Sequence, residues 1–279
     1  NKCINLMKAA IECSEKFSTV SPRYAQEIKD PFYAHKLDPI IRRNEFKLVG
    51  ILNGIDVDSY NSETDKAIFA NYSADNIEPK KKCKEELQKM FNLPVKPNTP
   101  MIAIISRLVA HKGLDLVRTV IEEVLRQDVQ IVILGKGDSA YENYFSDLSR
   151  KYVGKLVTII AFNPDLSRKI YSGADLFLMP SKSEPCGLSQ MIASRYGTVP
   201  IVRETGGLYD SIKPVGNGGN GFTFANYNAY DMLYVIREAI NCYYNKDFWP
   251  ELVKRVMSVD FSWQRSAKEY EKVYGEMLK

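Results

Sequence analysis

Residues 101–134 read MIAIISRLVAHKGLDLVRTVIEEVLRQDVQIVIL, and this stretch decides the fold class. It begins with the apolar run Met101–Ile105, which is typical of a buried strand. Apolar residues then recur at helical spacing from Val117 to Leu125, and a second, β-branched run follows at Val129–Leu134. A strand, a helix and a strand in this order predict two parallel strands joined by a crossover helix.

The same alternation continues along the chain to residue 202. We expect three further strands, at Leu156–Phe162, Asp175–Pro180 and Val199–Val202. Helices are expected between them at Ser139–Tyr152, Leu166–Ser172 and Gly187–Tyr196. Strands that are apolar throughout are typical of a parallel sheet covered by helices on both faces. The sequence therefore predicts an α/β fold with a doubly wound parallel sheet.

The two ends of the chain differ from this middle part. Residues 1–60 contain a helix and two expected strands, Lys16–Val20 and Lys47–Leu52. Residues 61–100 are charged and interrupted by prolines, and their one expected helix places Cys83, Leu87, Met90 and Phe91 on a single face. Near the C-terminus we expect an amphipathic helix around Met232–Ile240 and a last helix, Trp263–Leu278, with Ser262 as its N-cap.

Composition excludes several classes of protein. The 279 residues carry a net charge of only +4, which gives no reason to expect nucleic acid, and the basic run Lys80–Lys82 is typical of an exposed helix face. No apolar run reaches the ~18 residues of a membrane span. Five scattered cysteines and two histidines predict no metal site and favour a reducing cytosol. The start at Asn1 suggests a piece of a longer protein.

Doubly wound sheets bind ligands at the carboxyl ends of their strands, so the loops there are candidate sites. Arg107 and Lys112 flank the start of the first helix, where two cations suit a diphosphate, although they could equally be ordinary surface cations. After the second strand, residues 135–140 imitate the G-x-G-x-x-A pattern of dinucleotide sites, and a tight turn would explain the same glycines.

Two further loops carry candidates. Glu184 follows the fourth strand, where its carboxylate could bind sugar hydroxyls or merely cap the helix that Gly187 opens. Thr205, Gly206 and Gly207 follow the fifth strand, and paired glycines let backbone amides approach a phosphate, or simply make a turn. Four such loops at successive strand ends favour one shared binding site.

The motifs taken together resemble the bacterial-type glycogen synthases and plant starch synthases. The resemblance runs from about Thr19 to the end of the chain. The matching segments, in order, are Asn53-Gly54-Ile55-Asp56, Ser106-Arg107-Leu108, His111-Lys112-Gly113, Glu184-Pro185-Cys186-Gly187-Leu188, residues 195–203 (RYGTVPIVR) and Thr205-Gly206-Gly207-Leu208.

This resemblance implies the C-terminal part of a GT-B glycosyltransferase, which has two Rossmann-like domains facing across a cleft. Such an enzyme transfers glucose from ADP-glucose to the 4-OH of an α-1,4-glucan with retention of configuration, without metal or cofactor. The expected division is residues 1–52 as a remnant of the N-terminal domain plus hinge, 53–260 as the donor-binding domain, and 261–279 as a C-terminal crossover helix. The resemblance also implies a cytoplasmic protein.

The resemblance assigns roles residue by residue. Arg107 and Lys112 would neutralise the diphosphate leaving group, and Glu184 would hold the glucosyl hydroxyls and stabilise the transition state. Phe162 would stack on the nucleotide base, and Asn53 would face the glucosyl site. The remaining donor-binding residues would be Cys186, Gly187, Leu188, Thr205, Gly206 and Gly207.

The chain also departs from the family's pattern. Ser183 stands where an aromatic residue is common, His111 where Gln is common, and Ile192 where a broader glycosyltransferase pattern has a second Glu. The Lys-x-Gly-Gly-Leu loop of the family's N-terminal domain does not occur. Two alternatives follow: the chain by itself binds ADP or ADP-glucose without turnover, or, on Gly135 and Gly137 alone, it is an NAD-dependent oxidoreductase.

Overall fold

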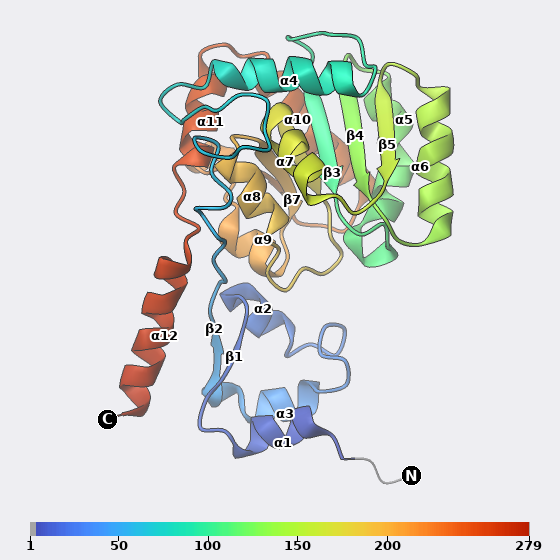
Figure 1. Ribbon diagram of the computed structural model, residues 1–279. Coiled ribbons are helices and arrows are strands. Elements are labelled where there is room, and N and C mark those ends of the chain that lie inside the picture. Colours follow the sequence, from blue (N-terminus) through green and yellow to red (C-terminus); the bar gives the residue numbers. More distant parts are fainter. Residues whose placement is uncertain (1–3, 279) are drawn as a thin grey trace.

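The computed structural model describes residues 4–278 and contains two sheets (Figure 1). The larger sheet has six parallel strands in the order β5-β4-β3-β6-β7-β8. Numbered from β3, this is the order 3-2-1-4-5-6, so the predicted doubly wound fold is confirmed. The strands are β3 (Met101–Ile105), β4 (Gln130–Gly135), β5 (Leu156–Ile160), β6 (Leu176–Met179), β7 (Val199–Arg203) and β8 (Phe222–Phe224).

Helices cover both faces of this sheet. Helices α5 (Leu114–Leu125) and α10 (Ala229–Tyr243) pack together on one face, where the apolar stripe of α5 is buried against β3 and β4. Figure 1 shows α7 (Pro164–Gly173) and α8 (Ser189–Arg195) in front of the opposite face. The remaining helices of this part are α4 (Pro79–Met90), α6 (Ser139–Lys151), α9 (Gly206–Ser211) and α11 (Phe248–Met257), with short 3₁₀ turns η2 (Ala110–Lys112) and η3 (Val215–Asn217).

Most predicted strands end earlier than expected. Strand β5 stops at Ile160, because its partner β4 ends at Gly135, which pairs with Ile160. Phe162 therefore lies beyond the sheet. Strand β8 and helix α11 were not predicted. Strand β8 has only three residues and follows a glycine-rich turn, so its sequence carries little periodicity.

Helix α4 corrects one prediction from the sequence. Lys81 and Lys82 are exposed as expected, but Lys80 donates hydrogen bonds to three buried oxygens and is not part of a solvated face. Buried Lys84 and Gln88 share the inward face of α4 with the expected Cys83 and Leu87. Met90, which was expected on the same face, is 45% exposed, and Phe91 is the C-cap of the helix.

A smaller part of the molecule lies below the sheet in Figure 1 and has its own hydrophobic core. Its two short strands pair in parallel, Phe17 with Leu48 and Thr19 with Gly50. Its core consists of Ile11, Ile28, Ala34, Ile40 and Ile41. Its elements are α1 (Leu6–Cys13), β1 (Phe17–Thr19), α2 (Pro22–Glu27), α3 (Asp38–Arg43), η1 (Glu45–Lys47) and β2 (Leu48–Gly50).

Two segments of chain leave the larger part side by side. The Ile55 amide donates to the Phe261 carbonyl at 2.8 Å, and a Cβ on Gly54 would lie 2.5 Å from the Trp263 nitrogen. Helix α12 (Trp263–Met277) then runs downward along the smaller part, with Ser262 as the predicted N-cap (Figure 1). Ser266 is the buried residue of α12, and its hydroxyl donates to the Leu52 carbonyl at 2.6 Å.

Candidate functional site

The candidate site lies where the strand order reverses, between β3 and β6, at the carboxyl ends of both strands. The loop after β3 crosses to the end of β6 at Gly113, whose φ is +77°. A Cβ on Gly113 would lie 2.0 Å from the Pro180 carbonyl oxygen, so only glycine permits this approach. The Lys182 amide also donates to the His111 carbonyl at 2.9 Å. The two loops are thus held together by backbone contacts.

This packing brings Lys112 and Glu184 together. Lys112 Nζ lies 2.5 Å from Glu184 Oε2, and the two side chains are only 15% and 10% exposed. The Ser181 hydroxyl donates to the same Oε2 at 3.0 Å. Within residues 4–278, Glu184 Oε1 receives no hydrogen bond, and it is not completely enclosed. A buried carboxylate with one free oxygen beside an ammonium group can bind a hydroxyl and an anion at one place.

Arg107 lies at the rim of the same crevice. It is exposed, and its guanidinium donates to His111 Nε2 at 3.3 Å. Partial burial, followed by the positive charges of Lys112 and Arg107, lowers the pKa of His111. His111 is therefore neutral at pH 7 and can accept this hydrogen bond. The structure thus places both predicted cations at the carboxyl end of β3.

The segment from Cys186 to Leu188 meets the chain at Asn53. Burial raises the pKa of the Cys186 thiol to about 11, opposed by a hydrogen bond with the Asn53 backbone. Asn53, which was predicted to face the glucosyl site, therefore lies against this segment. Gly187 has a φ of +69°, while Leu188 is 45% exposed at the start of α8. These predicted substrate-binding residues share one loop with Glu184.

Sequence reasoning missed Glu27, which contacts the loop before α9. The Glu27 carboxylate accepts from the Thr205 hydroxyl and from the Gly206 amide, at 3.0 to 3.2 Å. Thr205 is fully buried and Glu27 is 9% exposed. The two residues are 178 positions apart, so no local pattern could have found this contact. Helix α2 of the smaller part is thereby attached to the loop predicted to contact the donor.

The glycines of this loop also have a packing role. A Cβ on Gly206 would lie 2.0 Å from the Glu184 carbonyl oxygen, and a Cβ on Gly207 would lie 2.0 Å from that of Cys186. The Gly207 amide donates to the Glu184 carbonyl at 3.1 Å. The loop after β7 therefore supports the backbone of the Glu184 segment. Whether its three residues also contact a donor stays a prediction.

Two candidates lie away from the Lys112–Glu184 pair. Phe162 follows β5, two strands from β3, and its side chain is 90% exposed, as a stacking surface would be. Gly135 and Gly137 pack against the loop after β3, since their Cβ atoms would lie 2.0 and 2.3 Å from the Ser106 and Leu108 carbonyl oxygens. Close packing of two backbones thus accounts for the glycines on which the oxidoreductase alternative relied.

Comparisons with known proteins agree with this geometry. Residues 85–249 match the family model "Glycosyl transferases group 1", and residues 1–43 match "Starch synthase catalytic domain". The chain is 52% identical over 279 residues to a glycogen synthase of Clostridium acetobutylicum and 48% identical over 278 residues to one of Bacillus anthracis. Each alignment covers 99% of this chain and 58% of the relative.

A solved structure is also similar. The catalytic domain of starch synthase IV from Arabidopsis thaliana, bound to ADP and acarbose, superposes with a TM-score of 0.92 at 37% identity. The superposition covers 98% of this chain and 58% of that one. The six-stranded sheet and its helices thus have the fold of a GT-B glycosyltransferase catalytic domain. The chain belongs to the family of group 1 glycosyl transferases. It spans somewhat more than half the length of the glycogen synthases that it matches.

Within residues 4–278, none of the helices has both the length and the apolar character that crossing a membrane requires.

Proposed function

We propose that this chain is the donor-binding part of a glycogen or starch synthase, which transfers glucose from ADP-glucose to the 4-OH of an α-1,4-glucan with retention of configuration. The observation that carries this proposal is the Lys112–Glu184 pair at the switch point of the sheet. High identity to glycogen synthases supports it, as does the similarity to a starch synthase that binds ADP and acarbose.

The proposed mechanism follows from the charges in the crevice. Negative charge develops on the β-phosphate as the bond to glucose breaks, and Lys112 and Arg107 are placed to neutralise it. In the structure Lys112 donates to Glu184 at 2.5 Å. We infer that the diphosphate takes over Lys112, so that both Glu184 oxygens become available for glucosyl hydroxyls. Donor binding would thus prepare the carboxylate that stabilises the cationic transition state.

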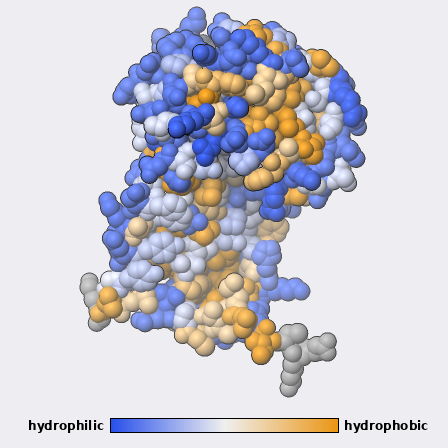
Figure 2. Space-filling model, viewed as in Figure 1, coloured by the Kyte–Doolittle hydropathy of each residue, from blue (hydrophilic) through white to orange (hydrophobic). Residues whose placement is uncertain are grey.

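We propose that residues 1–52 belong to an N-terminal domain that the relatives' additional length supplies. A two-stranded parallel sheet is a small unit that normally extends into a larger one. Figure 2 shows apolar side chains on the surface of this smaller part, and Leu6, Met7 and Phe46 are 61% to 79% exposed there. The other units would be a donor-binding domain of residues 53–260 and a crossover helix of residues 261–279.

Binding and turnover are expected to separate in this chain. The acceptor surface would lie across the cleft, so the chain alone should bind ADP without transferring glucose. Calorimetry with ADP tests the first part, and an assay of labelled glucose transfer from ADP-glucose to glycogen tests the second. The assay is run on this chain and on a protein of the relatives' full length that contains it. Absence of ADP binding, or of transfer by the longer protein, would overturn the proposal.

We also propose a cytosolic location. Cys13, Cys83, Cys186 and Cys242 are free thiols, as a reducing compartment favours. Fractionation of cells that express the protein would test this, and recovery outside the cytosol would contradict it.

A further inference from the structure

A second cavity lies at the opposite edge of the sheet, where the strands begin. Its volume is about 600 Å³, and it opens between α4 and the junction of α10 with α11. Because β3 has five residues, this edge is about 17 Å from the carboxyl edge that holds Lys112 and Glu184. The cavity is therefore separate from the proposed donor site, and nothing in the proposed function uses it.

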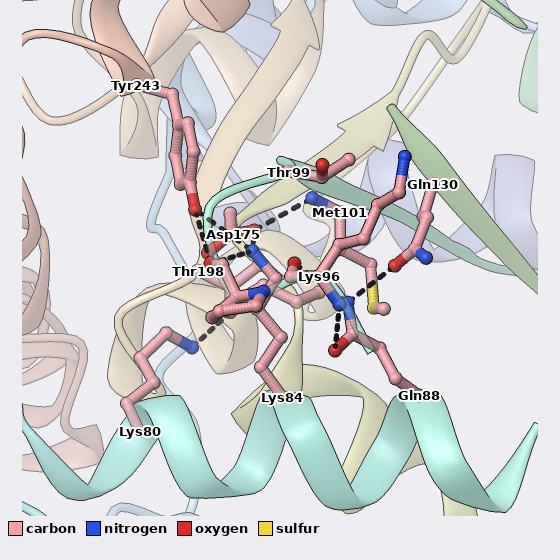
Figure 3. A network of polar contacts seen from close by, with 12 residues as sticks. Lys80, Lys84, Gln88, Lys96, Thr99, Met101, Gln130, Asp175, Thr198 and Tyr243 are labelled. Atoms are coloured by element: carbon pink, nitrogen blue, oxygen red, sulfur yellow. Dashed lines mark hydrogen bonds and ion pairs between the residues drawn. The ribbon is translucent and has the colours of Figure 1, made fainter. Parts of the chain in front are cut away.

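The cavity carries excess positive charge. Four lysines line it against two carboxylates, those of Glu78 and Asp175. Asp175 is already occupied, because it accepts from Lys84 Nζ at 2.6 Å and from the Met101 amide at 2.8 Å. Figure 3 shows Lys80 and Lys84 pointing from α4 toward this edge of the sheet. The four lysines are Lys80, Lys81, Lys84 and Lys246.

The charge on Lys80 is not matched by a contacting anion. Its ammonium donates to the carbonyls of Ser172 and Tyr196 and to the Thr198 hydroxyl, all of them neutral oxygens, at 2.9 to 3.1 Å. Burial, the dominant effect, lowers the pKa of Lys80 to about 8. A negative group entering the cavity would lower the cost of this buried charge.

Two lysines at the mouth of the cavity are free to bind such a group directly. Lys81 is paired only with Glu78, at 2.8 Å, in a contact where both side chains are more than 60% exposed. Lys246 is exposed and has no ion pair within residues 4–278. An exposed ion pair contributes little, so an incoming phosphate can compete for Lys81.

The far wall of the cavity is aromatic. The Tyr243 ring makes edge-on contacts with Trp249 and Tyr244, with ring centroids 5.1 and 5.5 Å apart. The Tyr244 side chain is 49% exposed and Ile77 and Val253 complete the apolar lining. A wall of this kind binds a flat ring or the apolar face of a sugar.

We propose that this cavity binds a small organic phosphate that carries a ring system. The phosphate would contact Lys81 and Lys246, and the ring would pack against Tyr244 and Trp249. An uncharged glucan would fit the aromatic wall but would leave the Lys80 charge unmatched, so the charge favours a phosphate ester. Nucleoside monophosphates and sugar phosphates share this chemistry.

Calorimetry on the chain distinguishes nucleoside monophosphates from sugar phosphates as ligands of the cavity. The three probes are AMP, glucose 1-phosphate and inorganic phosphate, each titrated separately. We expect AMP or glucose 1-phosphate to bind more tightly than inorganic phosphate, because inorganic phosphate has no ring to pack against the aromatic wall. The double variant Lys81→Ala with Lys246→Ala should weaken that binding about tenfold, through the loss of two charge-assisted hydrogen bonds.

One matched variant serves as the control. Lys82→Ala removes an exposed charge from the same helix outside the cavity. It should bind the probe as the unmodified chain does, and all variants should unfold at similar temperatures. Binding that the double variant leaves unchanged would overturn the proposal. Absence of binding by AMP and glucose 1-phosphate would overturn it as well.

Discussion

The two ends of strand β6 each carry a buried pair of lysine and carboxylate. At the amino end Lys84 meets Asp175 at 2.6 Å, and at the carboxyl end Lys112 meets Glu184 at 2.5 Å. Their surroundings differ. Asp175 also accepts the Met101 amide, and Lys84 also donates to the Pro97 carbonyl and the Tyr243 hydroxyl. Among the described residues, Lys112 donates to Glu184 alone.

The difference teaches how one kind of ion pair can serve two purposes. An ammonium whose three protons are all taken up by the surrounding fold holds a helix against a sheet and has no donor left for a ligand. An ammonium with unused donors at a crevice is available to an anion. The following predictions test this contrast, beginning with the largest expected effect.

Asp175→Asn should lower the free energy of unfolding by about 3 to 5 kcal/mol, because it leaves the Lys84 charge buried without a counter-charge. Urea denaturation measures this change. The control is Asp147→Asn, which breaks an exposed pair with Arg150 and should cost less than about 1 kcal/mol. Equal losses of unfolding free energy in the two variants would contradict the prediction that the buried Lys84–Asp175 pair contributes more to stability than the surface pair.

Glu184→Gln should reduce glucosyl transfer by about 10²- to 10³-fold in a protein of the relatives' length, because the transition state loses its nearest negative charge. The free energy of unfolding should fall by less than in Asp175→Asn, since the Lys112 side chain is 15% exposed at the crevice, against 5% for Lys84, and can be hydrated more readily. Kinetics and urea denaturation are measured side by side, with Glu238→Gln, at an exposed position of α10, as the control. Full turnover by Glu184→Gln would remove the assigned role.

Lys112→Ala should weaken ADP binding to the chain about tenfold, through loss of one charge-assisted contact to the diphosphate. Calorimetry at constant ionic strength measures the affinity. Lys82→Ala, which removes an exposed charge at the other edge of the sheet, should leave it unchanged. If both variants bind ADP alike, Lys112 has no part in the donor site.

The last prediction concerns pH and the amino edge of the sheet. Burial lowers the pKa of Lys80 to about 8 from an ordinary value of 10.5, so between these values the unfolded chain binds more protons than the folded chain. The contribution of Lys80 to the free energy of unfolding should therefore rise as pH increases from about 8 toward 10. Urea denaturation of the unmodified chain and of Lys80→Met, compared at each pH, isolates this effect from the buried tyrosines. A constant difference between the two would contradict it.

The carboxyl edge of the sheet could be predicted from the sequence, but the amino edge could not. Apolar runs fix the strands, and a parallel sheet collects the loops that follow them, so Arg107, Lys112 and Glu184 were expected at one edge. Lys80 and Lys84 look like a solvated basic run because the groups that bury them are about 90 or more positions away. Glu27 was missed for the same reason, since its partners lie in the loop before α9.

The parallel course of the segments at Ile55 and Phe261 has a mechanical consequence. If the smaller part turns against the larger one, the bending would be concentrated in the few residues of these two segments. Such a turn would have to break the contacts of helix α2 with the larger part, from Glu27 to Thr205 and Gly206 and from the Arg23 amide to Asp210. We expect the loss of these contacts and the opening of the crevice to be a single event.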